Sequence, residues 1–169
     1  MDPINTCYYL QELIMKCCIT GYTRGLGKVI NDYLVAQGWT VIGFSSSTNL
    51  DRIVELSKNC DLFVNNAYGA GIQIELLNQL YNSVGKMIVC GSVVTDSPDP
   101  QLPVYTQHKK ELEHRFLQVA DTANSQMLLL KLSSDAYNNP QLILRSIEFW
   151  LRNPEIKVIT YVAKEEPNR

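Results

Sequence analysis

Short apolar runs alternate along the chain with longer segments in which apolar residues recur every three or four positions. Six runs have the β-branched, apolar character of buried parallel strands: KCCIT (16–20), WTVIGF (39–44), DLFVNNA (61–67), GKMIVCGS (85–92), QMLLLKLS (126–133) and IKVITYVA (156–163). Five intervening segments show helical spacing, centred on residues 29–34, 53–57, 74–81, 112–119 and 142–150. This alternation predicts an α/β fold, a doubly wound parallel sheet of about six strands with helices on both faces.

Length and composition indicate one globular domain. The chain has 169 residues, 46% of them hydrophobic, and 15 basic against 17 acidic residues. This balance excludes the strongly basic character of proteins that bind nucleic acid or a membrane surface. No His, Cys and Asp cluster has the spacing of metal ligands, so we expect no metal site.

The cysteines and the N-terminus both favour the cytoplasm. Five cysteines occur, no two of them in a CxxC pair, which is typical of small buried side chains in a reducing compartment: Cys7, Cys17, Cys18, Cys60 and Cys90. No apolar run is long enough to span a membrane, and the first residues lack the pattern of a signal peptide.

Residues 1–14 are treated as an extension, and residues 15–169 as the domain. The sequence MKCCITGYTRGLG, from Met15 onward, would by itself be a complete start for the first strand and its loop. The extension is either an extra helix or the product of a misassigned start codon, and the sequence leaves both readings open.

The stretch TGYTRGLGK (20–28) follows the first predicted strand and opens the first predicted helix. In that context Gly21 permits a tight turn, Gly25 lets the backbone approach a pyrophosphate, and Gly27 lets the helix pack close to the strand. The N–H groups at the start of the helix would then face phosphate oxygens. An ordinary tight turn is the alternative reading of this loop.

Four features together resemble the short-chain dehydrogenase/reductase family: the spacing T-G-x-x-x-G-x-G, the NNA at 65–67, Ser92 at the end of a strand, and Tyr105 with Lys109 in YTQHK. The resemblance extends from Met15 to about Ala163 and implies a Rossmann-like fold that binds a nicotinamide cofactor. By this resemblance, the cofactor-binding positions are Thr20, Gly21, Thr23, Arg24, Gly25, Leu26, Gly27, Ser45, Ser46, Asn65, Asn66, Ala67, Tyr105 and Lys109.

The family's chemistry is hydride transfer between the cofactor and a carbonyl or alcohol, with catalytic residues Ser92, Tyr105 and Lys109. Tyr105 would be the general acid, and Lys109, one helical turn further, would lower its pKa as an ammonium and bond the nicotinamide ribose. Ser92 would polarise or hold the substrate oxygen. His108 and His114 are expected to be solvated helix residues.

The residues at the end of the second predicted strand indicate which nicotinamide cofactor is used. Family members that use NAD usually carry an acidic residue at its end, but here GFSSST offers only Ser45, Ser46 and Ser47. Arg24 stands where members that prefer NADP often have a basic residue, and an arginine pairs well with a 2′-phosphate. We therefore expect NADP rather than NAD.

Three departures from the family keep a second function open. The family's third strand is replaced by about a dozen residues that look helical, leaving only Asn49 or Asp51 as weak candidates to contact adenine. The relay asparagine has only Gln73 and Asn78 as candidates, and KLSSDAYNNPQ leaves no room for a substrate lid. The chain is then either a minimal reductase of small carbonyl substrates or a dinucleotide-binding module that senses or regulates.

The resemblance also predicts a partner. Helices over 74–81 and 105–119 would pair in a homodimer or homotetramer, with apolar surface from Tyr81, Leu112, Phe116 and Leu117. The alternative is that these side chains face the sheet.

Overall fold

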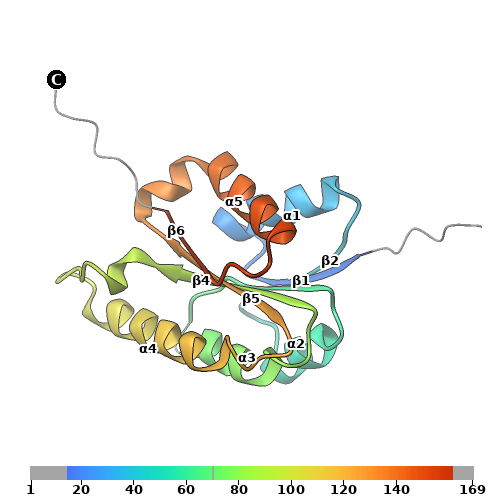
Figure 1. The fold of residues 1–169 in the computed structure, drawn as a ribbon, viewed down its shortest axis with the longest axis horizontal. Coiled ribbons are helices and arrows are strands. Elements are labelled where there is room, and N and C mark those ends of the chain that lie inside the picture. The colour runs from blue at the N-terminus through green and yellow to red at the C-terminus, as the bar shows by residue number, and fades with distance from the viewer. Residues whose placement is uncertain (1–14, 70, 162–169) are drawn as a thin grey trace, which may run out of the picture.

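The computed structural model describes residues 15–69 and 71–161. Six parallel strands form one sheet: β1 (Lys16–Thr20), β2 (Thr40–Phe44), β3 (Leu62–Asn65), β4 (Lys86–Ser92), β5 (Gln126–Leu132) and β6 (Val158–Tyr161). Their order across the sheet is β2-β1-β3-β4-β5-β6. The predicted number of strands and the doubly wound class are confirmed (Figure 1).

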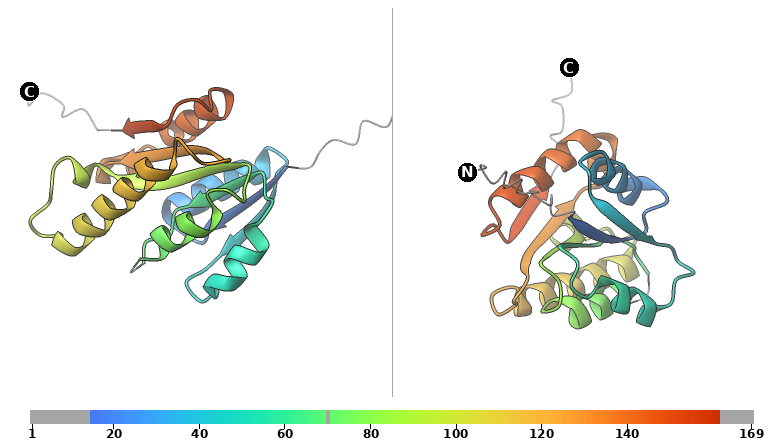
Figure 2. Two further views of the ribbon diagram at one scale, coloured as in Figure 1. Left: turned by 60° about the horizontal axis from the view of Figure 1, so that its bottom comes forward. Right: turned by 90° about the vertical axis from the view of Figure 1, so that its right-hand side faces the viewer.

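Helices cover both faces of the sheet (Figures 1 and 2). One face carries α1 (Gly25–Ala36) and α5 (Pro140–Arg152), and the other carries α2 (Leu50–Ser57), α3 (Ile72–Leu80) and α4 (Pro103–Val119). Two short 3-10 helices, η1 (Val93–Thr95) and η2 (Ser134–Asn138), follow the carboxyl ends of β4 and β5. The result is a three-layer sandwich with right-handed crossovers.

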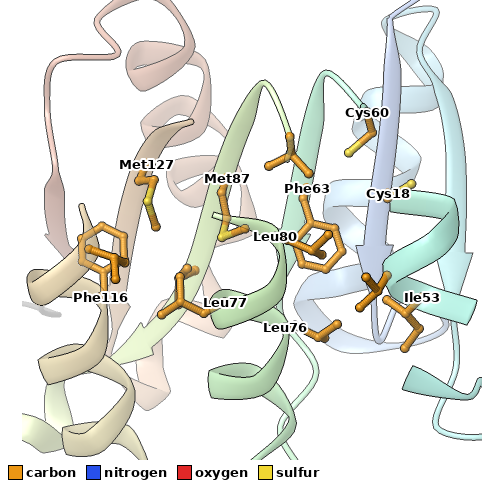
Figure 3. Close-up of a cluster of buried hydrophobic side chains, with 14 of the residues drawn as sticks. Cys18, Ile53, Cys60, Phe63, Leu76, Leu77, Leu80, Met87, Phe116 and Met127 are labelled. Carbon is orange, nitrogen blue, oxygen red and sulfur yellow. The ribbon is translucent and has the colours of Figure 1, made fainter. Parts of the chain in front are cut away.

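Each face of the sheet has its own apolar core. On the side of α2, α3 and α4, Phe63, Met87 and Met127 point from the strands toward Leu77 and Phe116 of the helices (Figure 3). On the other side Trp150 of α5 is fully buried, and its indole Nε1 donates to the Ile156 carbonyl at 2.9 Å. A fully buried side chain of this size stabilises the fold by roughly 1.5–3 kcal/mol, so these contacts hold both helix layers firmly on the sheet.

The strand order creates a switch point beside β1. The chain passes from β1 to β2 at one edge and then crosses to β3 on the other side of β1. Loops at the carboxyl ends of β1 and β3 therefore diverge and leave a crevice, which is where doubly wound sheets bind ligands. The glycine loop follows β1 and the Asn66–Ala67 pair follows β3, so both predicted motifs border this crevice.

The shortening predicted between β2 and β3 is confirmed, because α2 alone bridges them and β2 lies at the edge of the sheet. The extension at 1–14 lies outside the described residues. Within the ranges that are described, no helix is both long and apolar enough to cross a membrane.

The proposed role of Leu112 and Phe116 in a dimer surface is wrong. Their side chains are 1% and 0% exposed, because both point from α4 into the core beneath the sheet. Leu117 is 55% exposed and Tyr81 is partly buried against the same core, so only part of the predicted apolar surface is available on these helices.

Candidate active site

The glycine loop between β1 and α1 is shaped by two glycines in particular. Gly25 has φ +53°, and a Cβ there would meet nothing within 4 Å, so its backbone faces open space. A Cβ on Gly27 would lie 2.1 Å from the Gly21 carbonyl oxygen, which no side chain can tolerate. The loop thus combines an open approach to the backbone with a tight contact between helix and strand.

Thr20 joins the glycine loop to the loop that follows β3. Its Oγ1 accepts from the backbone N–H of Asn66 at 3.0 Å and of Ala67 at 2.9 Å. The Asn66 side chain returns a hydrogen bond to the Thr20 carbonyl at 3.1 Å. Because Thr20 is 2% exposed, these bonds are shielded from water and fix one loop against the other.

A cavity of about 890 Å³ opens between these loops and the end of β2. Residues from all three strand ends line it: Thr20, Gly21, Thr23, Arg24, Leu26, Phe44, Ser45, Ser46, Ile53, Asn66, Ala67, Tyr68, Gly69 and Ile72. We call it the cofactor cavity. It brings together most of the positions predicted to bind a cofactor, including Arg24 with Ser45 and Ser46, and no carboxylate is among these residues.

Asn65 is placed differently from its prediction. The residue is 0% exposed, and its Nδ2 donates to the Gln73 carbonyl at 2.7 Å, so it binds α3 to β3 instead of lining the cavity. Asn49 and Asp51 also lie outside the lining. The Asn49 side chain instead caps α2 by accepting from the Asp51 N–H at 2.7 Å.

Ser92 and Tyr105 meet at a second, smaller cavity of about 340 Å³, which we call the substrate cavity. Its other lining residues come from η1, the loop before α4, β5 and η2: Val93, Val94, Ser97, Asp99, Leu102, Leu132 and Ser134. Because Ser92 and Tyr105 both line this cavity, their side chains border the same space. The polar loop at 95–103, predicted to border a ligand, supplies one wall.

The expected lowering of the Tyr105 pKa by Lys109 is not seen in this structure. Burial raises the pKa of Tyr105 above its ordinary value, and the hydrogen bond with Ser92 opposes that shift without cancelling it. The Lys109 ammonium lies 5.6 Å from the centroid of the Tyr105 ring but is directed at other partners. Tyr105 is therefore held as a neutral hydroxyl, which can donate a proton.

Lys109 belongs to a buried polar network with Gln73 of α3. Its Nζ donates to Gln73 Oε1 at 2.7 Å and to the Cys90 carbonyl at 2.9 Å, and both side chains are 4% exposed. Gln73 Nε2 in turn donates to the Asn65 carbonyl at 2.9 Å. Burial lowers the pKa of Lys109 to about 8.

Of the two candidates for the relay position, only Gln73 lies in the site. Asn78 is exposed, and its side-chain oxygen accepts from Arg115 Nε on the surface of α4. Gln73 was a candidate by its location only, because its contact with Lys109 spans 36 positions and no local spacing indicates it.

Two further groups near the site were missed. Lys131 of β5 is buried, and its Nζ contacts Asp96 Oδ1 at 2.7 Å and Glu113 Oε1 at 3.0 Å, which joins the loop after η1 to α4. Burial alone would lower the pKa of Lys131, but its bonds to the two carboxylates raise it. A lysine inside an apolar strand was the available signal, since such a residue needs buried partners.

Tyr68 and His108 form the other group. The Tyr68 hydroxyl and His108 Nδ1 are 3.0 Å apart, and the Tyr68 ring meets the Tyr105 ring edge-on with centroids 4.9 Å apart. His108 is thus not simply a solvated helix residue, whereas His114 is exposed and contacts only Gln118 among the described side chains. Among the residues that the structure describes, no group of His, Cys, Asp and Glu could hold a metal.

Solved structures with this architecture are numerous, with 321 chains matching. A small-chain dehydrogenase has a TM-score of 0.71 at 12% identity over 88% of this chain and 96% of its own. The chain has the short-chain dehydrogenase/reductase fold.

Two cofactor complexes match over similar lengths. The 3-ketoacyl-(acyl-carrier-protein) reductase from Brucella melitensis, complexed with NADH, has a TM-score of 0.67 at 14% identity over 86% of this chain and 95% of its own. The angucycline C-6 ketoreductase LanV with bound NADP has a TM-score of 0.61 at 12% identity over 86% and 93%. No family model and no curated protein matches the sequence.

Proposed function

We propose that the protein is an NADP(H)-dependent oxidoreductase that transfers a hydride between the cofactor and a small carbonyl or alcohol. The observation that carries the proposal is the convergence of Ser92 and Tyr105 on one cavity, with Lys109 one helical turn behind them. Structural neighbours with bound NADH and NADP support a nicotinamide dinucleotide as the cofactor.

The cofactor cavity suits such a molecule in shape and charge. Gly25 stands between the lining residues Arg24 and Leu26, although it is not itself in the lining, and it leaves open space at the start of α1, whose first turn contains no acidic residue to repel phosphates. Arg24, Ser45 and Ser46 line the same wall and supply donors for a 2′-phosphate. Phe44, Ile53 and Ala67 supply apolar surface for the adenine ring.

In the proposed reduction, NADPH held in the cofactor cavity would supply the hydride to the carbonyl carbon. Ser92 donates a hydrogen bond to the carbonyl oxygen, and Tyr105 gives that oxygen the proton that completes the alcohol. The raised pKa of Tyr105 keeps this proton in place until the substrate needs it. The Lys109 ammonium, 5.6 Å from the centroid of the Tyr105 ring, would stabilise the resulting phenolate only after turning from its present partners, Gln73 and the Cys90 carbonyl.

The substrate cavity favours a small molecule with an apolar body. Its wall combines Val93, Val94, Leu102 and Leu132 with the hydroxyls of Ser97 and Ser134.

We place the reaction in the cytoplasm, a proposal supported by the free, buried state of the four cysteines that the structure describes. The proposed homodimer or homotetramer now relies on exposed Leu117 and on Tyr81, and sedimentation of the purified protein at micromolar concentration tests it.

The first test is a calorimetric titration with NADPH and with NADH. We expect NADPH to bind more tightly, and Arg24→Ala to weaken NADPH binding by about ten- to a hundredfold while leaving NADH within about twofold, because a charge-assisted contact of this kind contributes roughly 1.5–3 kcal/mol. Equal loss for both cofactors in the variant would contradict a contact to the 2′-phosphate.

Turnover separates the reductase from the second candidate, a dinucleotide-binding sensor. That candidate is favoured by the lack of any residue common to the linings of the two cavities. NADPH oxidation is followed across a panel of small aldehydes and ketones. We expect Tyr105→Phe to reduce the rate by about 10²–10⁴-fold while NADPH binding stays within about threefold. Binding without any turnover by the wild type would favour the sensor.

A further inference from the structure

The cofactor cavity and the substrate cavity share no lining residue, although Tyr68 borders the first and Tyr105 borders the second. These two side chains touch each other, with ring centroids 4.9 Å apart and ring planes at 66°. The Tyr68–Tyr105 contact is therefore part of the wall between the cavities.

A wall at this position conflicts with the proposed reaction. Hydride transfer needs the reacting atoms of cofactor and substrate about 3–3.5 Å apart, which requires one continuous space from the glycine loop to Ser92. One of the side chains in between must move when both ligands are bound.

The buried members of the site are poorly suited to move. Lys109 and Gln73 are each 4% exposed and are tied together at 2.7 Å, and Lys109 also donates to the Cys90 carbonyl. Moving either residue would leave a buried charge or amide without a partner.

Tyr68 is the member that can move at low cost. Its side chain is 50% exposed, and its hydroxyl has one partner among the described residues, His108 Nδ1 at 3.0 Å. Its ring adds an edge contact with Tyr105 and lies 5.7 Å from the Lys109 ammonium. Water can replace the exposed hydrogen bond to His108 when the ring swings out. The edge contact with Tyr105 and the approach to the buried Lys109 ammonium are modest beside the two hydrogen bonds that hold Lys109 itself.

We propose that Tyr68 is a movable partition between the two cavities, latched by His108, and that its rotation admits the nicotinamide end of the cofactor to Ser92 and Tyr105. This inference rests on the proposed function. Tyr68 acts as a positioning residue: the closed arrangement accepts the adenosine half of the cofactor but opposes the nicotinamide half. The affinity for the whole cofactor is then reduced by the fraction of molecules that are closed.

The test compares two probes, NADPH and adenosine 2′,5′-bisphosphate, which lacks the nicotinamide half. Binding of each is measured by calorimetry on the full chain, for the wild type and for Tyr68→Ala. We expect the variant to bind NADPH about tenfold more tightly, as for a partition that is closed in roughly nine molecules of ten, and to bind the bisphosphate within about twofold of the wild type.

Two further variants keep the test valid if Tyr68→Ala folds poorly. Tyr68→Phe and His108→Ala each remove the hydrogen bond between residues 68 and 108 and retain the aromatic ring at position 68. We expect each variant to bind NADPH about two- to threefold more tightly and to bind the bisphosphate as the wild type does. Tyr33→Ala is the matched control, because Tyr33 is also partly buried and donates from its hydroxyl to Glu148 Oε1 at 2.8 Å, but it lines neither cavity.

The binding results distinguish a failure of the partition from a failure of the proposed function. NADPH binding that is unchanged or weaker in Tyr68→Ala, with the bisphosphate still bound, overturns the partition and leaves the proposed function intact. If none of the proteins binds either nucleotide, both the proposed function and the partition are overturned.

Discussion

The two cavities are built by different kinds of interaction. The cofactor cavity is held by backbone geometry: the glycine loop, the contact between Gly27 and the Gly21 carbonyl, and the Thr20 hydroxyl bonded to two backbone N–H groups. The substrate cavity is held by side chains from distant parts of the chain, above all Lys131 with Asp96 and Glu113. Interactions of the first kind are encoded in short motifs, whereas those of the second kind are not.

The difference matters for how each region tolerates change. A backbone contact leaves no room for adjustment, so a single added methyl group is costly. In an ion pair with one exposed partner, water can solvate that partner when the other is lost, so the removal costs less free energy. Three changes test this comparison, in decreasing order of expected effect.

Gly27→Ala should cause the largest loss of stability. The new Cβ would lie 2.1 Å from the Gly21 oxygen and 2.8 Å from Asn66 Nδ2, so the helix must shift away from the strand. We expect the free energy of unfolding to fall by about 3 kcal/mol or more, measured by urea denaturation.

Gly38→Ala is the control for that change. Gly38, unlike Gly27, has a positive φ, +83°, and a Cβ there meets nothing within 4 Å, so backbone strain of about 1–2 kcal/mol without any steric contact is expected. A loss at Gly27 no larger than the loss at Gly38 would contradict a costly contact between α1 and β1.

Lys131→Met should have an intermediate effect on the substrate side. It leaves Glu113, whose Oε2 is already buried without a hydrogen-bond partner, beside an apolar side chain. Asp96 is 58% exposed and can be solvated, so we expect a loss of about 2–3 kcal/mol, below the range for a fully buried pair.

The ion pairs of Lys131 also predict that a second substitution recovers part of the stability lost in Lys131→Met. Combining Lys131→Met with Glu113→Gln should restore part of the lost stability, because the unpaired carboxylate is then removed. A double variant that is no more stable than Lys131→Met would contradict the role given to Glu113.

The smallest expected effect is a change of the free energy of unfolding with pH, which arises from Lys109. Its pKa is lowered to about 8 in the folded state from 10.5, so the unfolded chain binds more protons between these values. Stability therefore rises with pH in this window, relative to a Lys109→Met variant that has no such group. Between pH 8 and 9.5 we expect the difference in free energy of unfolding to grow by on the order of 1–2 kcal/mol.

Denaturant titrations of both proteins at these two pH values measure the effect, and the subtraction removes all groups that the two proteins share. A difference that does not change with pH would mean that Lys109 keeps its ordinary affinity for protons despite its burial.

The fold was accessible from the sequence because its elements are strongly periodic. Runs such as KCCIT and QMLLLKLS are buried on both faces of the sheet, and their apolar character is continuous. The predicted strand at 61–67 ends earlier than expected, at Asn65, because the next two residues turn to bond Thr20. Local sequence does not reveal such a partner 47 positions away.

The site was accessible only in part. Ser92, Tyr105 and Lys109 could be found because their spacing is a motif, and the structure brings them together. The interface residues Leu112 and Phe116 were predicted wrongly, and Asn65 lies outside the cavity lining, because a residue type does not show which side of a strand or helix faces the core. Tyr68, Gln73 and Lys131 gained their roles from neighbours on other elements.

The sequence by itself determined the alternation of strands and helices, the glycine loop and the spacing of the proposed catalytic residues, because these depend on local periodicity and on the conformational freedom of glycine. Only the tertiary structure decided that Lys109 bonds Gln73, that Lys131 bridges Asp96 and Glu113, and that Tyr68 lies against Tyr105. These contacts arise when separate strands and helices pack, and burial then sets the pKa of Tyr105 and Lys109 to values that no linear pattern contains.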